Sequence, residues 1–152
     1  MQITDLDRRL LRNLQRTPSL SVSELAELAG MTTPTTARRL DRLREAGVIK
    51  GQVATLNWAA LGFSVEVSLR ITLDKTSARS FDDFLEAARK IPEVIEIQTF
   101  LGRVDVRLHI LARDMGHYQQ LYRASILTLP HISDIEALMQ VATIKSDEAL
   151  PI

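Results

Sequence analysis

The sequence predicts an α+β protein in which a winged helix-turn-helix over residues 1–53 is followed by a ferredoxin-like domain over residues 63–152. Two patterns predict this division. Apolar residues recur at helical spacing in the first third of the chain, whereas from Phe63 onward they alternate with polar residues as in a half-buried strand. Between the two parts, residues 54–62 carry few charges and are expected to form a hinge, with Trp58 as its packing anchor. A chain of 152 residues is long enough for two small domains.

The composition is typical of a folded globular protein, with 45% hydrophobic and 25% charged residues. The absence of cysteine excludes disulfides, thiolate metal sites and cysteine nucleophiles. No apolar run approaches the roughly 18 residues that a membrane helix needs, and the acidic, poorly apolar N-terminus does not resemble a secretory signal. We therefore expect a cytoplasmic protein without a membrane partner.

The first helix is indicated by leucines at helical spacing from Leu6 to Leu14. Thr4 or Asp5 can cap its start, and Pro18 follows its end. The second helix begins at the S-x-x-E capping box of residues 21–24, in which a hydroxyl and a carboxylate satisfy two free amides.

The third helix follows after only three residues, Gly30-Met31-Thr32, which is the short glycine-containing turn of a helix-turn-helix. We expect Thr33 to cap this helix, with a proline at its first position, and Gly47 to end it. Residues 48–53 have the pattern of a short ribbon that turns at Gly51, which would supply the wing of a winged helix.

The outward face of the third helix is basic and predicts DNA binding. Thr35, Arg38, Arg39 and Arg42 lie on this face, since three or four residues separate Thr35 from Arg38 and Arg39, and those two from Arg42. The arginine forks can hold phosphates or the edge of guanine. Residues 1–62 hold nine Arg and Lys against six Asp and Glu, a net charge of +3 within a chain that is neutral overall. The residues expected to contact DNA are Thr33, Thr35, Thr36, Arg38, Arg39, Arg42 and Lys50. The structural alternative is a small helical bundle with a solvated arginine face.

The C-terminal part reads as β-α-β-β-α-β, the ferredoxin-like order. Strands are expected over about 63–74, 94–101, 104–112 and 134–144, and helices from residue 77 or 80 to 90 and from 114 to about 129. Only Gly102-Arg103 separates the middle strands, which fits a two-residue hairpin with a type II′ turn. Because both helices cover one face of the sheet, the other face must be solvated or covered by a partner, and dimerisation is expected.

The stretch MTTPTTARRLDRLREAGVIKGQ closely resembles the recognition helix and wing of the Lrp/AsnC family, the feast/famine transcription regulators. The opening TDLDRRLLRNLQ and the later LGRVD and TLPHISDIEALM resemble this family as well, so the resemblance covers nearly the whole chain. It implies a regulator that binds double-stranded DNA, with a hinge and a C-terminal domain for ligand sensing and oligomerisation. It also implies a homodimer that assembles further, often to an octamer, and a response to an amino acid or a related metabolite.

The resemblance places an effector site near a Gly-x-x-Asp turn between the middle strands, here Gly102 to Asp105. Amides at such a turn can bind a carboxylate, and Asp105 can accept hydrogen bonds from an ammonium group. Alternatively, Gly102 only makes the turn and Asp105 only satisfies local amides. The residues implied to line a pocket between subunits are Leu101, Gly102, Arg103, Asp105, Met115, Leu138, Met139 and Gln140.

The sequence departs from the family beside this aspartate. Many members carry an aromatic residue there, whereas this chain has Val104 and Val106, so the pocket is expected to be reshaped or to bind nothing. Arg103 and Arg107 can supply extra charge for an acidic ligand.

No enzymatic activity, cofactor or metal is expected. The three histidines, His109, His117 and His131, lack the spacing of metal ligands, and no P-loop, nucleophile elbow or dinucleotide fingerprint occurs. Two alternatives to a sequence-specific regulator stay open. One is an Lrp-like enzyme of the siroheme decarboxylase type, and the other is an architectural protein that compacts DNA with little sequence preference.

Overall fold

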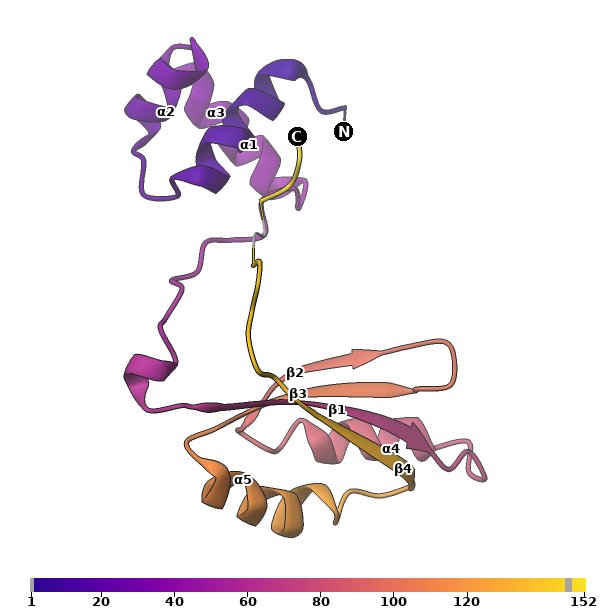
Figure 1. Cartoon of the computed structure of the whole chain (residues 1–152). Helices are drawn as coiled ribbons and strands as arrows, with labels where there is room; N and C mark the ends of the chain where they lie inside the picture. The colour runs from indigo at the N-terminus through magenta and orange to yellow at the C-terminus, as the bar shows by residue number, and fades with distance from the viewer. Residues whose placement is uncertain (1, 147–148) are drawn as a thin grey trace. The chain divides into compact units, whose positions relative to one another are not determined.

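The computed structural model describes residues 2–146 and 149–152, which form two compact units (Figure 1). Among the described residues, the N-terminal unit consists of 2–55 together with a C-terminal segment, residues 145–146 and 149–152, and the C-terminal unit is Leu56–Ile144. Within the described residues, no helix has the length and apolar character needed to cross a membrane.

The N-terminal unit contains three helices, α1 (Asp5–Arg16), α2 (Val22–Ala29) and α3 (Thr33–Glu45). The predicted cap of the second helix is confirmed, because Ser21 and Glu24 form a complete capping box. Gly30 then ends α2 with φ 68°, a left-handed conformation that glycine adopts without strain. In the same unit, the Gln15 side chain exchanges two hydrogen bonds of 2.8 Å with the Leu150 backbone, which holds the C-terminal segment against α1.

The start of α3 differs from the prediction by one residue. Thr32 is the cap, Thr33 is already helical, and Thr32 makes no side-chain capping bond but donates its hydroxyl to the Thr35 hydroxyl at 2.9 Å. The end is as predicted, since Gly47 is left-handed with φ 69°.

The ribbon predicted over 48–53 is wrong, because no strand forms there. The amides of Val48 and Ile49 both donate to the Leu43 carbonyl and so continue the helix cap. Val53 is 94% exposed, and only Ile49 of this segment packs against the helices. The segment thus lacks the partner strand that a ribbon requires.

The three helices enclose a small apolar core. Leu10 of α1, Leu25 of α2, and Leu40 and Leu43 of α3 are each at most 2% exposed. These residues fix the rotation of α3 about its axis, and therefore decide which of its side chains face outward.

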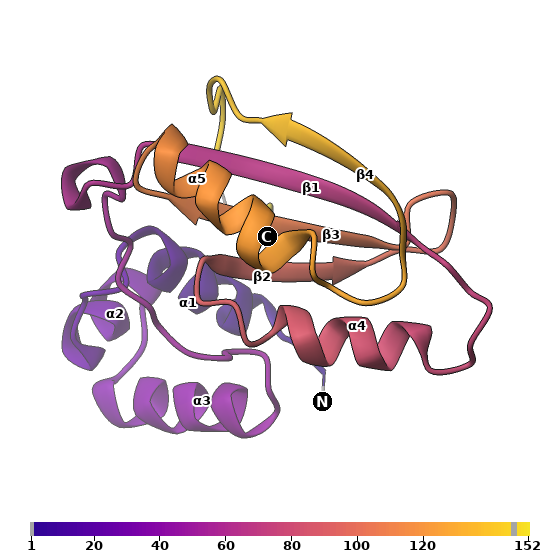
Figure 2. The same ribbon diagram turned by 90° about the horizontal axis from the view of Figure 1, so that it is seen from below.

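The C-terminal unit has the predicted β-α-β-β-α-β order. A 3-10 turn (Ala59–Leu61) precedes β1 (Val65–Leu73), α4 (Ser80–Ala88), β2 (Val94–Thr99), β3 (Val106–Ala112), α5 (Met115–Leu121), a π turn (Tyr122–Ile126) and β4 (Ile132–Met139). The strands form one antiparallel sheet in the order β2-β3-β1-β4, and both helices lie on the same face of it (Figure 2). This is the ferredoxin-like arrangement.

The alternation predicted for the first strand is confirmed and divides the sheet into two faces. Val67, Leu69 and Ile71 are at most 1% exposed and pack with Phe84 of α4 and Ile126 of the π turn. The opposite, open face carries polar side chains from every strand: Glu66, Ser68, Arg70, Thr72, Glu96, Gln98, Arg107, His109, Asp134 and Glu136.

Three details of this unit differ from the prediction. The β2–β3 connection is not a two-residue hairpin, because the last backbone bond runs from the Phe100 amide to the Asp105 carbonyl, and four residues lie between them. The final helix changes to a π turn after Leu121, where the Leu127 amide bonds to Tyr122, five residues earlier. The last strand ends at Met139, which opposes Val67 of β1, rather than near residue 144.

Candidate nucleic-acid interface and effector region

The three arginines on α3 occupy different environments. Arg38 is exposed, and its guanidinium has no hydrogen-bond or ion-pair partner among the described residues. The side chain of Arg39 is only 22% exposed, and that of Arg42 is 47% exposed. The expected basic face is therefore present, but its members are not equivalent.

The difference arises from Asp7, an acidic residue of α1 whose side chain is 0% exposed. One carboxylate oxygen accepts from Arg39 Nη1 at 2.8 Å, and the other accepts from Arg42 Nη2 at 3.0 Å. The amide and hydroxyl of Thr4 donate to the same carboxylate at 2.9 and 2.7 Å. We call these four residues, Thr4, Asp7, Arg39 and Arg42, the Asp7 cluster.

The Asp7 cluster keeps its carboxylate charged. Burial by itself raises the pKa of Asp7. The hydrogen bonds from Thr4 and the hydrogen bond and charge of Arg39 lower this pKa by a larger amount, so that it falls from 3.8 to about 2. The carboxylate is thus ionised at neutral pH, where it accepts hydrogen bonds from two arginines of α3.

The threonines expected to contact DNA are also not equivalent. Thr33 is exposed at the start of α3, and Thr35 is half-buried. Thr36 is 0% exposed, and its hydroxyl is buried without a partner among the described residues, so the expectation that it contacts DNA is corrected. Lys50 is exposed just beyond the α3 cap.

The sequence did not predict that Asp7 binds the arginines of α3. A local signal existed, because Thr4-x-x-Asp7 is a capping box that the structure contains in full. The arginine contacts cross 32 and 35 residues of sequence, and no spacing rule within one helix predicts them.

In the C-terminal unit, the loop from Leu101 to Asp105 joins β2 to β3. Leu101 is fully exposed, and Arg103 is exposed. Asp105 is 2% exposed, and its carboxylate accepts from the Leu73 amide at 2.8 Å and pairs with Lys75 Nζ at 2.7 Å. Asp105 therefore satisfies local groups, which corrects the expectation that its carboxylate faces a ligand ammonium.

Burial raises the pKa of Asp105, but the Lys75 ammonium and the Leu73 amide lower it more, so the pKa lies below its usual value. The charge of Asp105 thus stabilises the native loop at neutral pH, and this contribution decreases as the pH falls through its lowered pKa.

Replacing Asp105 with alanine is expected to destabilise the C-terminal unit by about 1–3 kcal/mol, because the buried Leu73 amide loses its acceptor. The measurement is native-state hydrogen exchange at the Leu73 amide, which should lose protection. Glu86→Ala is the matched control, since Glu86 pairs with Lys90 at an exposed position and its loss should change stability by less than about 0.5 kcal/mol. Equal exchange at Leu73 in the two variants would contradict this role of Asp105.

The remaining residues implied to line the effector pocket lie at the other end of the sheet. Met139 pairs with Val67, and the Gln140 amide donates to the Glu66 carbonyl, whereas the Gly102 loop adjoins Ile71. Leu138, Met139 and Met115 are 37%, 48% and 42% exposed. Within one chain the structure therefore does not bring the two groups into one pocket.

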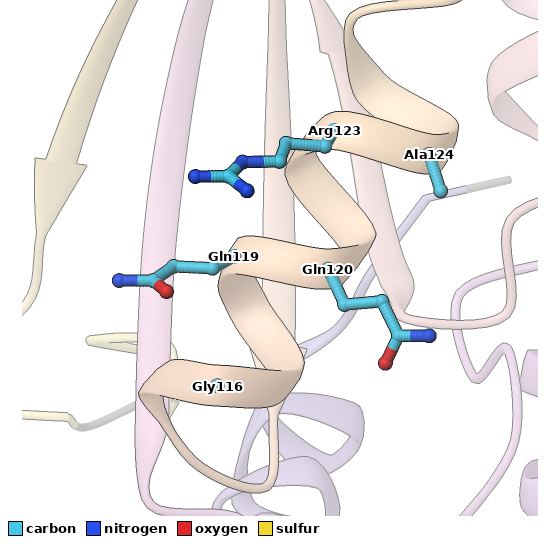
Figure 3. A pocket seen from close by; sticks show the side chains of 5 residues that line it. All are labelled: Gly116, Gln119, Gln120, Arg123 and Ala124. Carbon is cyan, nitrogen blue, oxygen red and sulfur yellow. The ribbon is translucent and has the colours of Figure 1, made fainter.

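Another surface hollow lies along the outer flank of α5 and the π turn (Figure 3). Gly116, Gln119, Gln120, Arg123 and Ala124 line it. In Figure 3, Gln119 and Arg123 project to one side of the helix and Gln120 to the other. All five residues come from one continuous segment, so nothing faces them from a second element to enclose a ligand.

The three histidines each meet a carboxylate. His109 contacts Glu66 at 2.6 Å, His117 contacts Glu93 at 3.3 Å, and His131 contacts Asp83 at 3.1 Å. Trp58 is 39% exposed and packs edge-on against His109, with ring centroids 6.1 Å apart. In the described ranges, no three metal-ligating side chains gather in one place.

Comparison with known proteins covers both units. Residues 66–150 match a family model described as the Lrp/AsnC ligand binding domain, and residues 3–50 match one described as winged helix-turn-helix DNA-binding. The transcriptional regulator AzlB of Bacillus subtilis is 30% identical over 152 residues, which is 100% of this chain and 97% of AzlB. The DNA-binding transcriptional activator DecR of Escherichia coli is 29% identical over 147 residues, 97% of each chain.

Solved structures share the same architecture. An AsnC family transcriptional regulator from Agrobacterium tumefaciens is 31% identical, with a TM-score of 0.87 over 97% of this chain and 96% of that one. A transcriptional regulator from Neisseria meningitidis, solved in complex with L-methionine, has a TM-score of 0.91 at 24% identity, over 99% of this chain and 97% of the other.

Proposed function

The chain belongs to the Lrp/AsnC family of transcriptional regulators, and we propose that it recognises its DNA with α3 and Arg38, while a small amino acid or related metabolite tunes its assembly or DNA affinity. The observation that carries this proposal is the exposed guanidinium of Arg38 on α3, for which the described residues supply no partner. A guanidinium free of protein partners can bind the O6 and N7 edge of guanine in the major groove.

Most of the other residues predicted to contact DNA are placed to bind phosphate groups. Arg42 uses only Nη2 on Asp7 and keeps further donors for a phosphate oxygen. Thr33 and Lys50 lie near the two ends of α3, and a helix start is a favourable place for an anion. Thr35 adds a hydroxyl beside Arg38. Arg39, which is largely buried against Asp7, positions the helix.

Symmetric assembly would present two or more copies of α3 to DNA. The open face of the C-terminal sheet is polar and carries ion pairs such as Arg107–Glu96 at 3.2 Å and Arg70–Glu136 at 3.5 Å. Such a face, with both charge signs, suits a self-complementary dimer contact. We propose a homodimer that assembles to an octamer, with residues 54–62 as the hinge and the cytoplasmic nucleoid as its place of action. The L-methionine complex of the Neisseria meningitidis protein supports a small effector for this fold.

The test is fluorescence anisotropy with DNA from upstream of the protein's own gene, compared with random DNA of equal length at two salt concentrations. We expect tight binding with a clear preference for the upstream DNA, about 10³-fold or more for a specific site. Equal binding to both DNAs, falling steeply with salt, would replace the proposal with an architectural role. Failure to bind either DNA would contradict the assigned interface.

A further inference from the structure

The C-terminal segment packs with the N-terminal unit, although it follows the last strand of the C-terminal unit (Figure 1). Gln15 of α1 donates from Nε2 to the Leu150 carbonyl at 2.8 Å, and its Oε1 accepts from the Leu150 amide at 2.8 Å. A hollow of about 730 Å³ lies between the two partners, lined by Arg12, Gln15 and Arg16 of α1 and by Lys145 and residues 149–152. The C-terminal segment is thus docked at one defined place on α1.

The contact is chemically specific. A side-chain amide presents one donor and one acceptor, as a peptide group does, so Gln15 can pair with both backbone groups of one residue. Two residues of an antiparallel strand pair exchange both of their backbone bonds in the same way. Pro151 favours this arrangement, because the residue before a proline is biased toward an extended conformation. The sequence of the segment therefore prepares Leu150 for Gln15.

The contact is also weak enough to open. Both hydrogen bonds join neutral groups at exposed positions, and such bonds contribute little beyond what water offers to the same groups. The Leu150 residue is 64% exposed, so docking buries little apolar surface. Ordering the segment also costs conformational entropy. The docked and released forms are therefore close in free energy.

Docking closes a second connection between the two units. The first connection is the chain that runs from Thr55 to β1. The second begins at Gln140, whose amide donates to the Glu66 carbonyl in the C-terminal unit, and reaches Lys145 in the N-terminal unit. Five residue steps span at most roughly 18 Å. A docked segment therefore limits how far the N-terminal unit can move from the end of β4.

The residues that we propose for DNA contact do not take part in docking. None of them lines the hollow between α1 and the C-terminal segment. Asp7, through which α1 binds the arginines of α3, lies eight residues before Gln15, about 12 Å away along the helix axis at 1.5 Å per residue. Docking thus restrains the N-terminal unit and leaves its candidate DNA-binding face open.

We propose that the C-terminal segment is a reversible restraint on the N-terminal unit. When residues 149–152 are docked on Gln15, two connections limit the movement of this unit relative to the C-terminal unit. When they are released, one connection remains and the unit moves more freely. The restraint is a property of the free protein and does not depend on the proposed recognition of DNA.

Docking is tested by the rate at which trypsin cleaves the full chain after Lys145, followed by mass spectrometry. Cleavage requires the released form, so its rate follows the population of that form. Gln15→Met keeps the length of the side chain but loses both hydrogen bonds, and Leu150→Pro removes the amide donor without changing α1. Each variant should be cleaved about tenfold faster. Gln52→Met is the matched control, because Gln52 donates to the Pro18 carbonyl at 3.0 Å in the same unit, and it should leave the rate unchanged.

The restraint itself is tested by the distance between two spin labels, one in each unit. The chain has no cysteine, so Ser19→Cys and Asp82→Cys, both at exposed positions, supply the only labelling sites. Labelled chains are diluted into an excess of unlabelled chains, so that only distances within one chain are measured. We expect a narrow distribution of distances with the natural segment and a clearly broader one with Gln15→Met or Leu150→Pro.

Two results would overturn the inference. One is equal cleavage after Lys145 in Gln15→Met and Gln52→Met, which would mean that the Gln15 contact does not hold the segment. The other is a distance distribution of unchanged width in both released variants, which would mean that docking does not restrain the unit. Both measurements are made without DNA, so a failure to bind upstream DNA counts against the proposed function alone.

Discussion

Replacing Asp7 with alanine is expected to destabilise the N-terminal unit by about 2–3 kcal/mol. The carboxylate is fully buried and accepts from Thr4, Arg39 and Arg42, so its removal leaves several donors without a partner. Breaking a buried ion pair typically costs about 3–5 kcal/mol, and the partial exposure of the two arginines reduces this, because water can reach them.

Native-state hydrogen exchange of the α1 and α3 amides measures this change within the N-terminal unit alone. Asp41→Ala is the matched control, because Asp41 is 66% exposed and pairs with Arg44 on the surface of α3. It should change stability by less than about 0.5 kcal/mol. If the two variants were equally stable, the Asp7 cluster would have no structural role.

The pH dependence of the same variant series has a definite sign. The folded-state pKa of Asp7, about 2, is lower than its ordinary value of 3.8, so the unfolded chain binds a proton first as the pH falls. The stabilisation by the charge, about 2 kcal/mol, is complete above about pH 5 and is lost as the pH falls from about 4 to 2. The stability difference between the natural chain and Asp7→Asn should therefore shrink over this range, and a constant difference would contradict the assignment.

Replacing Arg38 with alanine is expected to weaken binding to the preferred DNA about 10- to 100-fold while changing the affinity for random DNA far less. A bidentate arginine–guanine contact is worth about 1–3 kcal/mol of discrimination, whereas a phosphate contact acts on every sequence alike. The ratio of the affinity for the preferred DNA to the affinity for random DNA, measured by anisotropy, should therefore decrease strongly.

Arg44→Ala is the control for Arg38, because Arg44 lies on the same helix but points about 120° away from Arg38 around its axis. Arg44 also pairs with Asp41 at 3.1 Å, so it is already engaged in the protein. Arg42→Ala should behave differently from both: it should weaken all DNA binding and lower the salt slope by about one. If Arg42→Ala instead abolished the preference and Arg38→Ala preserved it, the base contact would belong to the arginine bound by Asp7.

Local rules predicted most elements of both units. The capping box at Ser21, the helix end at Gly47 and the alternation through β1 each depend on residues close in sequence, and each is present in the structure. The ribbon over 48–53 failed because the helix cap draws Val48 and Ile49 back to Leu43. A strand also needs a partner, and no local pattern specifies one.

The candidate site shows the same division. The spacing of Arg38, Arg39 and Arg42 predicted one helix face with three equivalent arginines. In the structure Arg39 and Arg42 are bound by Asp7 of α1, and Arg38 is not bound by it, so the residue that distinguishes them lies outside α3. Thr36 was assigned outward from its neighbours, yet the rotation of α3 is set by contacts of Leu40 and Leu43 with the other helices. For Asp105 the sequence allowed either a ligand-binding or a local structural role. The local role depends on the Leu73 amide, which is 32 residues away in sequence and donates to the Asp105 carboxylate.

The order β2-β3-β1-β4 leaves β2 and β4 as edge strands. The unpaired backbone groups of an edge strand can pair with a strand of another chain, which can lead to aggregation. Both edges carry features that oppose this. β2 has an irregular register between Val94 and Glu96, and β4 carries Asp134 and Glu136 along its length. These two strands therefore make extension of the sheet into fibrils unfavourable, which the proposed closed assembly through the open face requires.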